Sequence, residues 1–351
     1  MVIVFAILIF SFLIFIHEFG HFIAAKLSGV QVNEFAVFMG PALLKWGKGE
    51  TQYSIRCIPI GGYCAMEGEE EDTDNPRSFQ KATWWKRLII LAAGSLMNFI
   101  AGLLIFLLVF SSAEQIAMPV IVEAEPGCSI VSEEGLHVGD RFLQINGENV
   151  YVASNVSMLL NLNDSDTYDI LVERDGKQVF LDDFKMQTHM FPNPDGSESL
   201  RYGITFGVKD ADFGGIMDLT WNTALDTVRT VRISLQMLIT GKAGIQDLSG
   251  PVGIVQIMSD TAAASDTAWD AFLNMMYFGG FIAINLSVMN LLPIPALDGG
   301  RIVGLLLTTV IEKITRKKLN PKVESYIHGG GMILLLILMA VIMFKDIFAL
   351  F

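Results

Sequence analysis

The stretch FLIFIHEFGHFIAAKLSG, residues 12–29, decides the fold because it places ionisable side chains inside an apolar segment. Every residue before His17 is uncharged, which predicts a membrane-spanning helix. The segment has no basic start and no small-residue cleavage site, so we expect a retained span and not a signal peptide. His17 and His21 lie four residues apart and share a helix face, so both imidazoles can bind one cation while Glu18 reaches a water molecule.

Composition points to a membrane protein along most of the chain. The 351 residues are 52% hydrophobic and only 17% charged, and their mean hydropathy is +0.48. The uncharged stretches 88–113 and 271–297 are long enough to cross a hydrocarbon core of about 30 Å. The last apolar stretch, 329–344, reaches that length only with its neighbours, and a buried core helix is an alternative for it. No basic patch with aromatic residues suggests a nucleic acid partner.

Charge is unevenly distributed and predicts the orientation in the bilayer. Residues 112–220 carry the whole net charge of −13, so the rest of the chain is balanced. A basic segment follows the third apolar stretch, with Glu312 as its only acid. Its basic residues are Arg301, Lys313, Arg316, Lys317, Lys318 and Lys322. Because cytoplasmic loops are enriched in Lys and Arg, we expect this segment and 29–87 inside, and 112–270 outside the cell.

These changes of polarity divide the chain into eight predicted regions. They are a first span with the HExxH (1–28), a cytoplasmic-side loop with a re-entrant β-hairpin (29–87), a second span (88–113), an extracytoplasmic domain (114–212), an amphipathic or linker region (213–270), a third span (271–300), a basic cytoplasmic loop (301–326) and a fourth span (327–351).

Several local patterns are specific enough to predict elements. Residues 51–65 alternate and break at Pro59 and the following glycines, which indicates a strand or hairpin. Residues 168–186 predict a hairpin around Asp175-Gly176. Residues 221–238 have apolar side chains at helical spacing, so they form either an amphipathic helix at the membrane surface or an ordinary packed helix.

A metal held by two histidines needs a third protein ligand. Zinc suits imidazole ligands with one open position, where it lowers the pKa of a bound water to about 7. Asp298 is the acid at the end of the third apolar stretch, in NLLPIPALDGG, residues 290–300. Alternation of the spans brings it to the same cytoplasmic half as His17 and His21, although a helix-end cap is the alternative for this carboxylate. The three cysteines show neither metal-ligand spacing nor a disulfide framework.

HEFGH near the start and NLLPIPALDGG late in the chain resemble the site-2 protease family of intramembrane metalloproteases. Within it, the chain resembles bacterial regulators that process anti-sigma factors and leftover signal peptides. The proline usual in the family's second-span motif is Ser95 here, which affects the local helix geometry. Four further stretches carry the resemblance: PIGGY (59–63), AGSLMNF (93–99), 134–150 and LSGPVGI (248–254).

The resemblance implies a mechanism and a set of roles. It implies Zn²⁺ held by His17, His21 and Asp298, with Glu18 as the base that activates water. Gly61 and Gly62 belong to a re-entrant β-loop that pairs with an extended substrate. Asn290 and Asn98 help to hold the substrate; helix packing is the alternative for both.

The implied fold is a polytopic α-helical membrane protein of about four transmembrane helices, with a re-entrant β-loop and one inserted extracytoplasmic α+β PDZ-like domain. The implied activity is zinc-dependent regulated intramembrane proteolysis in the bacterial cytoplasmic membrane. Substrates would be pre-trimmed transmembrane proteins such as anti-sigma factors and signal-peptide remnants, and the PDZ-like domain would exclude or recruit them.

Two other classes remain open at this point. One is a non-proteolytic metal-binding scaffold or transporter, although a transporter would show internal repeats or paired broken helices. The other is a soluble zinc protease with a membrane anchor, which would not place its metal ligands in two separate spans.

Overall fold

The structure is a computed structural model of the chain, and it forms two compact units. The first comprises Met1–Phe106 and Thr227–Phe351, and the second comprises Leu107–Asp226. The residues that the structure describes are 2–69, 73–128, 130–162, 165–192, 197–316 and 321–348.

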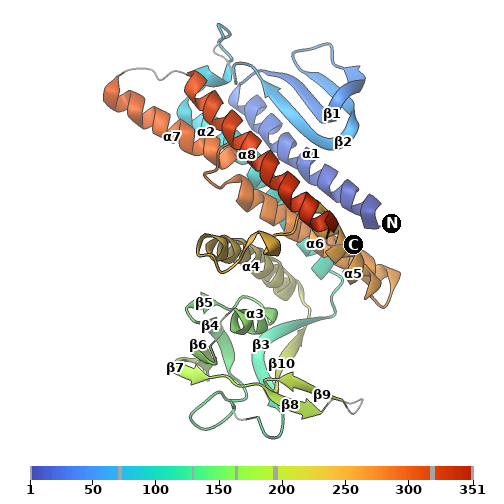
Figure 1. Cartoon of the computed structure of the whole chain (residues 1–351), viewed down its shortest axis with the longest axis vertical. Helices are drawn as coiled ribbons and strands as arrows, with labels where there is room; N and C mark the ends of the chain where they lie inside the picture. Colours follow the sequence, from blue (N-terminus) through green and yellow to red (C-terminus); the bar gives the residue numbers. More distant parts are fainter. Residues whose placement is uncertain are drawn as a thin grey trace. The chain divides into compact units, whose positions relative to one another are not determined.

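Four described helices are long and apolar enough to cross a membrane (Figure 1). They are α1 (Val2–Ser28), α2 (Trp84–Phe110), α6 (Ala268–Asn290) and the Tyr326–Phe348 part of α8 (Pro321–Phe348). Their apolar side chains often face outward; Leu104 is 56% exposed and Leu334 67% exposed. Such exposure suits helices whose surroundings are lipid, because their backbone groups are bonded internally. The prediction of about four transmembrane helices is confirmed by the length and composition of these helices.

Small residues let the helices of the first unit approach closely. A Cβ added to Gly20 of α1 would lie 2.4 Å from the carbonyl oxygen of Ala93 in α2. A Cβ on Gly102 of α2 would lie 2.5 Å from Cγ1 of Ile284 in α6. Small side chains at such crossings are typical of helix packing in membranes. Helices α1, α2 and α6 are therefore held at close range around the metal-binding motif.

The third span ends earlier than its apolar sequence suggests. Helix α6 ends at Asn290, whereas the sequence predicted a span through residue 300. Pro293 and Pro295 lack the N–H needed to continue the helix, so the chain turns although it remains apolar. A separate helix, α7 (Asp298–Thr315), then begins at the predicted ligand.

The segment 301–326, predicted as a basic cytoplasmic loop between two spans, contains most of α7. Apolar residues recur through α7 at helical spacing, as at Ile302, Leu305 and Leu306, and this periodicity outweighs the basic residues near its end. Lys317 and Lys318 of the basic segment lie outside the described residues.

The loop after α1 contains more β-structure than predicted. Strand β1 (Val32–Trp46) pairs antiparallel with β2 (Gln52–Met66), and only the second was expected from the sequence. Phe35 is opposite both Cys64 and Tyr53, so β2 flanks the first half of β1 on both sides. Residues 62–66 consequently pair with β1 on one side only, among the strands that the structure describes. Figure 1 shows these two strands next to α1.

The region 213–270, predicted as amphipathic or linker, is largely helical. It holds α4 (Phe213–Ile239) and α5 (Pro251–Ala263), with a short 3-10 turn at Ile245–Asp247 between them. Asp346 of α8 accepts hydrogen bonds from the backbone N–H groups of Gly250 and Gly253, at 2.8 and 2.9 Å. This buried carboxylate satisfies donors at the start of α5 that the helix itself cannot pair.

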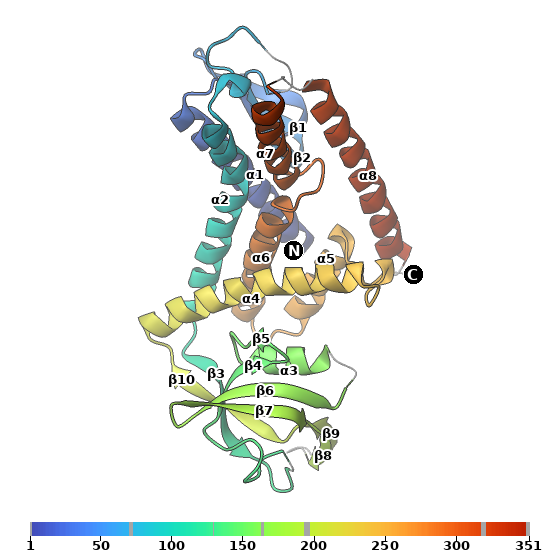
Figure 2. The same cartoon turned by 90° about the vertical axis from the view of Figure 1, so that its left-hand side faces the viewer.

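The second unit is built on a six-stranded sheet with one short helix (Figure 2). Its strand order is β10-β3-β4-β6-β7, with β5 paired to β4, and a small two-stranded sheet joins β8 to β9. The elements are β3 (Gln115–Ala124), β4 (Arg141–Ile145), β5 (Glu148–Asn149), α3 (Ser154–Asn161), β6 (Thr167–Arg174), β7 (Lys177–Lys185), β8 (His189–Pro192), β9 (Glu198–Arg201) and β10 (Ile204–Asp210).

Alternating side chains build the core of this unit. Tyr168, Ile170 and Val172 of β6 are buried on one face, against Phe142 and other apolar residues. The predicted hairpin is confirmed, because Arg174 pairs with Lys177 and both turn residues between them have positive φ. A PDZ identity for this α+β unit stays a prediction.

Candidate metal centre

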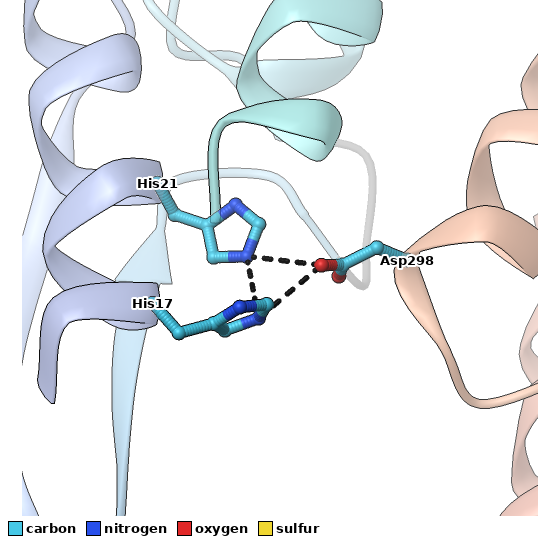
Figure 3. Close-up of side chains that lie close together, drawn as sticks. All are labelled: His17, His21 and Asp298. Atoms are coloured by element: carbon cyan, nitrogen blue, oxygen red, sulfur yellow. Dashed lines mark hydrogen bonds and ion pairs between the residues drawn. The ribbon is translucent and has the colours of Figure 1, made fainter. Parts of the chain in front are cut away.

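Two histidines on successive turns of α1 face each other (Figure 3). Their Nε2 atoms are 3.2 Å apart, and the two rings lie edge to face. The Nδ1 atom of His21, whose ring is buried, lies 2.8 Å from the carbonyl oxygen of Ile90 in α2. A carbonyl can only accept, so it fixes the proton on Nδ1 and leaves the Nε2 lone pair free for a metal.

Asp298 reaches the same point from the start of α7. Its Oδ2 atom lies 3.2 Å from His17 Nε2 and 3.4 Å from His21 Nε2. This oxygen is buried and makes no hydrogen bond. Ligands about 2.0–2.1 Å from a tetrahedral zinc ion are roughly 3.3–3.4 Å apart, so the three donor atoms fit one ion. The predicted ligands His17, His21 and Asp298 are therefore brought together (Figure 3).

Gly94 of α2 leaves the space in front of the imidazoles open. A Cβ at this position would lie 2.4 Å from His21 Nε2 and 2.8 Å from His17 Cε1. No side chain larger than hydrogen can be placed there without moving the two imidazole rings. The surrounding AGSLMNF stretch carries part of the family resemblance, but its pattern alone does not reveal this reason for Gly94.

Glu18 faces the β1–β2 sheet. A Cβ added to Gly62 would lie 3.5 Å from Cγ of Glu18 and 3.0 Å from the carbonyl oxygen of Ala36. The absence of a side chain at Gly62 therefore lets the backbone of β2 approach the carboxylate. Gly61 has a φ of +83° and packs against Met39, so its glycine is required by backbone conformation.

The two predicted asparagines differ in their position. Nδ2 of Asn290, the last residue of α6, is 3.5 Å from Nδ1 of His17. Asn98 lies one helical turn beyond Gly94, is buried, and its Oδ1 atom has no hydrogen-bond partner. Asn290 therefore lies beside the candidate ligand His17, whereas Oδ1 of Asn98 makes no hydrogen bond to any described residue.

Two links to the segment that carries Asp298 were not found from the sequence. Nη1 of Arg301 is 2.6 Å from Oε1 of Glu69, in the loop after β2. Nδ1 of His328 accepts a hydrogen bond from the backbone N–H of Ala296 at 3.0 Å. His328 and Ala296 are 32 residues apart, so only the folded chain shows this contact.

Comparisons with known proteins agree along the whole chain. The model of peptidase family M50 matches residues 5–338. A candidate zinc metalloprotease of Clostridium acetobutylicum is 38% identical over 350 residues, covering 98% of this chain and 97% of the relative. The regulator of sigma-W protease RasP of Bacillus subtilis is 27% identical over 430 residues, and zinc metalloprotease RasP of Bacillus licheniformis 28% over 434; both alignments cover 98% of each chain.

Proposed function

The chain belongs to peptidase family M50, and we propose that His17, His21 and Asp298 are its zinc ligands and Glu18 its general base. It is a zinc metalloprotease, and its reaction is regulated intramembrane proteolysis. The observation that carries the assignment is the convergence of three possible ligand atoms within 3.2–3.4 Å of one another, in front of a glycine.

The roles of the residues follow from their positions. Bound zinc supplies a Lewis acid that polarises a peptide carbonyl and lowers the pKa of water. Glu18 adjoins His17 on α1 and lies close enough to both histidines and Asp298 to interact with them electrostatically. It takes the proton of the attacking water and returns it to the leaving amine. Asn290 supports the ring of His17, because its amide, turned by 180°, accepts the Nδ1 proton.

The strand edge next to Glu18 is the proposed substrate platform. A transmembrane helix resists proteolysis because its amides are bonded internally, so the scissile segment must become extended. Among the strands that the structure describes, residues 62–66 of β2 pair on one side only, and Gly62 borders the Glu18 side chain. An unwound substrate that adds to this edge as a strand would bring its peptide bonds to the base. Gly61 maintains the turn into this edge, while Asn98 is proposed to contact the substrate or to pack between helices.

The cellular setting is proposed from charge and from the relatives. The basic residues around α7 support a cytoplasmic orientation for that end of the helices in a bacterial membrane. One relative is named as a regulator of sigma-W protease, which supports anti-sigma factors, together with signal-peptide remnants, as substrates.

The unit Leu107–Asp226 would be an extracytoplasmic PDZ-like domain that admits only trimmed substrates. Deleting residues 115–210 should then permit cleavage of untrimmed substrates, whereas complete loss of cleavage would indicate recruitment.

Cleavage of a tagged model transmembrane substrate by the purified protein in detergent tests the catalytic assignment. Glu18→Gln keeps all three proposed ligands and removes the base, so zinc content should be unchanged while cleavage falls by about 10²- to 10⁴-fold. Cleavage by wild type should also be sensitive to a chelator. If Glu18→Gln cleaves as fast as wild type, Glu18 is not the base. If wild type and Glu18→Gln bind equal amounts of zinc but neither cleaves any of several pre-trimmed substrates, the scaffold alternative is favoured.

A further inference from the structure

The turn that carries Asp298 provides no side-chain cap for the start of α7. Between the end of α6 and the start of α7, residues 291–297 form tight local turns interrupted by two prolines. Leu297, the N-cap residue of α7, makes no side-chain hydrogen bond to the helix. The carboxylate of Asp298 therefore projects from a helix end that no N-cap side chain holds.

Ala296 has an unusual backbone conformation. Its φ is +78°, in the left-handed region that residues with a Cβ rarely adopt. Alanine has no polar side chain to compensate for this conformation, so neighbouring structure must hold it. The backbone N–H of Ala296 donates to Nδ1 of His328, 32 residues later in α8. One side chain of α8 thus holds the backbone two residues before the proposed ligand.

A second contact from α8 reaches the same turn. A Cβ on Gly331 would lie 2.4 Å from Cβ of Pro295 and 2.8 Å from its carbonyl oxygen. The two preceding glycines are different, because a Cβ on Gly329 or Gly330 would meet nothing within 4 Å. Of these three consecutive glycines, only the third is required by packing. His328 and Gly331 lie three residues apart on α8 and so share one face, which is the face against the turn.

We propose that His328 and Gly331 position the third zinc ligand, so that zinc affinity depends on docking of α8 against residues 293–297. This inference rests on the proposed role of Asp298. His328 is a positioning residue and not a catalytic one, because it acts on the ligand through the backbone of Ala296. The hydrogen bond sets the backbone direction, and the absent side chain of Gly331 sets how closely α8 approaches.

Zinc affinity of the full-length protein in detergent, measured by competition with a chelator, tests the proposal without relying on cleavage. His328→Ala removes the acceptor and should weaken zinc binding about tenfold or more, as loss of groups that orient metal ligands does. His328→Asn should remain within about threefold of wild type, because its side-chain oxygen can take the place of Nδ1. Gly331→Ala should weaken binding like His328→Ala, while Gly330→Ala, the matched control, should not.

Asp298→Ala separates failure of this inference from failure of the proposed function. If Asp298→Ala binds zinc like wild type, the proposed ligand set is wrong. If Asp298→Ala loses zinc affinity, adding His328→Ala should cause no further loss, because both act through one ligand. Wild-type zinc affinity in His328→Ala, or equal losses in His328→Asn and His328→Ala, would overturn the positioning role. So would equal effects of alanine at positions 330 and 331.

Discussion

The two sides of the proposed metal centre are held in place by different means. His17 and His21 belong to one continuous helix of 27 residues, and their spacing alone puts both rings on one face. Asp298 begins a second helix after a proline-containing turn, and contacts from α8 and from the loop after β2 hold its surroundings. The histidine side is therefore local in sequence, whereas the aspartate side depends on residues far along the chain.

This difference has a consequence for mutations. A change on the histidine side should act by altering the donor atoms or the space in front of them. A change on the aspartate side can act from a distance, because the backbone that carries the ligand is held by tertiary contacts. Substitutions remote from the metal should consequently weaken zinc binding mainly on the aspartate side.

The largest effect is expected at Gly94. Gly94→Ala places a Cβ 2.4 Å from His21 Nε2, so zinc affinity and cleavage should both fall by about 100-fold or more. Gly102→Ala is the control in the same helix, because its Cβ would meet Cγ1 of Ile284 at 2.5 Å and no imidazole. It should lower thermal stability and keep zinc. Equal zinc affinity in the two variants would contradict the role of Gly94.

A smaller effect is expected from the ion pair between Glu69 and Arg301. Glu69→Gln weakens a 2.6 Å pair that links the loop after β2 to the first turn of α7, so zinc affinity should fall roughly 3- to 10-fold. Arg77→Ala is the matched control, since Arg77 pairs with Glu50 at 2.5 Å near the end of α1. The chelator competition should show no change in that control. A loss as large in Arg77→Ala would mean that any ion pair in this unit affects the metal.

The smallest effect concerns the pH dependence of thermal stability at Glu50, which pairs with Lys26 near the end of α1. Hydrogen bonds from Lys26 and Arg77 lower the pKa of Glu50 to about 2. A carboxyl group whose folded pKa is depressed stabilises the fold above its unfolded pKa, near 4.5, and loses this contribution as pH falls towards 2. Because the group is partly exposed, Glu50→Gln should lower the Tm at pH 7 by only about 2 °C. The difference between variant and wild type should shrink below pH 4; a constant difference would exclude this linkage.

Much of this centre could be predicted from the sequence, and the reason is local. The i, i+4 spacing of His17 and His21 puts both side chains on one face of a helix, and Asp298 was the acid at the end of an apolar stretch. The end of the third span was predicted less well, since hydropathy continues to Leu297 while Pro293 and Pro295 stop the helix. Strand β1 was missed because its apolar residues lack regular alternation.

The contacts that hold Asp298 could not be predicted, because they join residues far apart. No pattern within α8 distinguishes Gly331 from Gly330, and no pattern around His328 identifies the N–H of Ala296 as its partner. Arg301 was assigned to a basic loop, although it lies in the first turn of α7 and pairs with a residue 232 positions earlier. These features are set by packing and not by local propensity.

X-ray absorption at the zinc edge, on the full-length protein loaded with one equivalent of zinc, tests the central claim most directly. The account predicts about four nitrogen or oxygen neighbours near 2.0–2.1 Å, including two imidazoles, and no sulfur. In His17→Ala loaded with zinc, the number of imidazole neighbours should fall from two to one. A sulfur neighbour near about 2.3 Å, for which Cys64 of β2 would be the first candidate, or a spectrum unchanged in His17→Ala, would contradict the proposed ligand set.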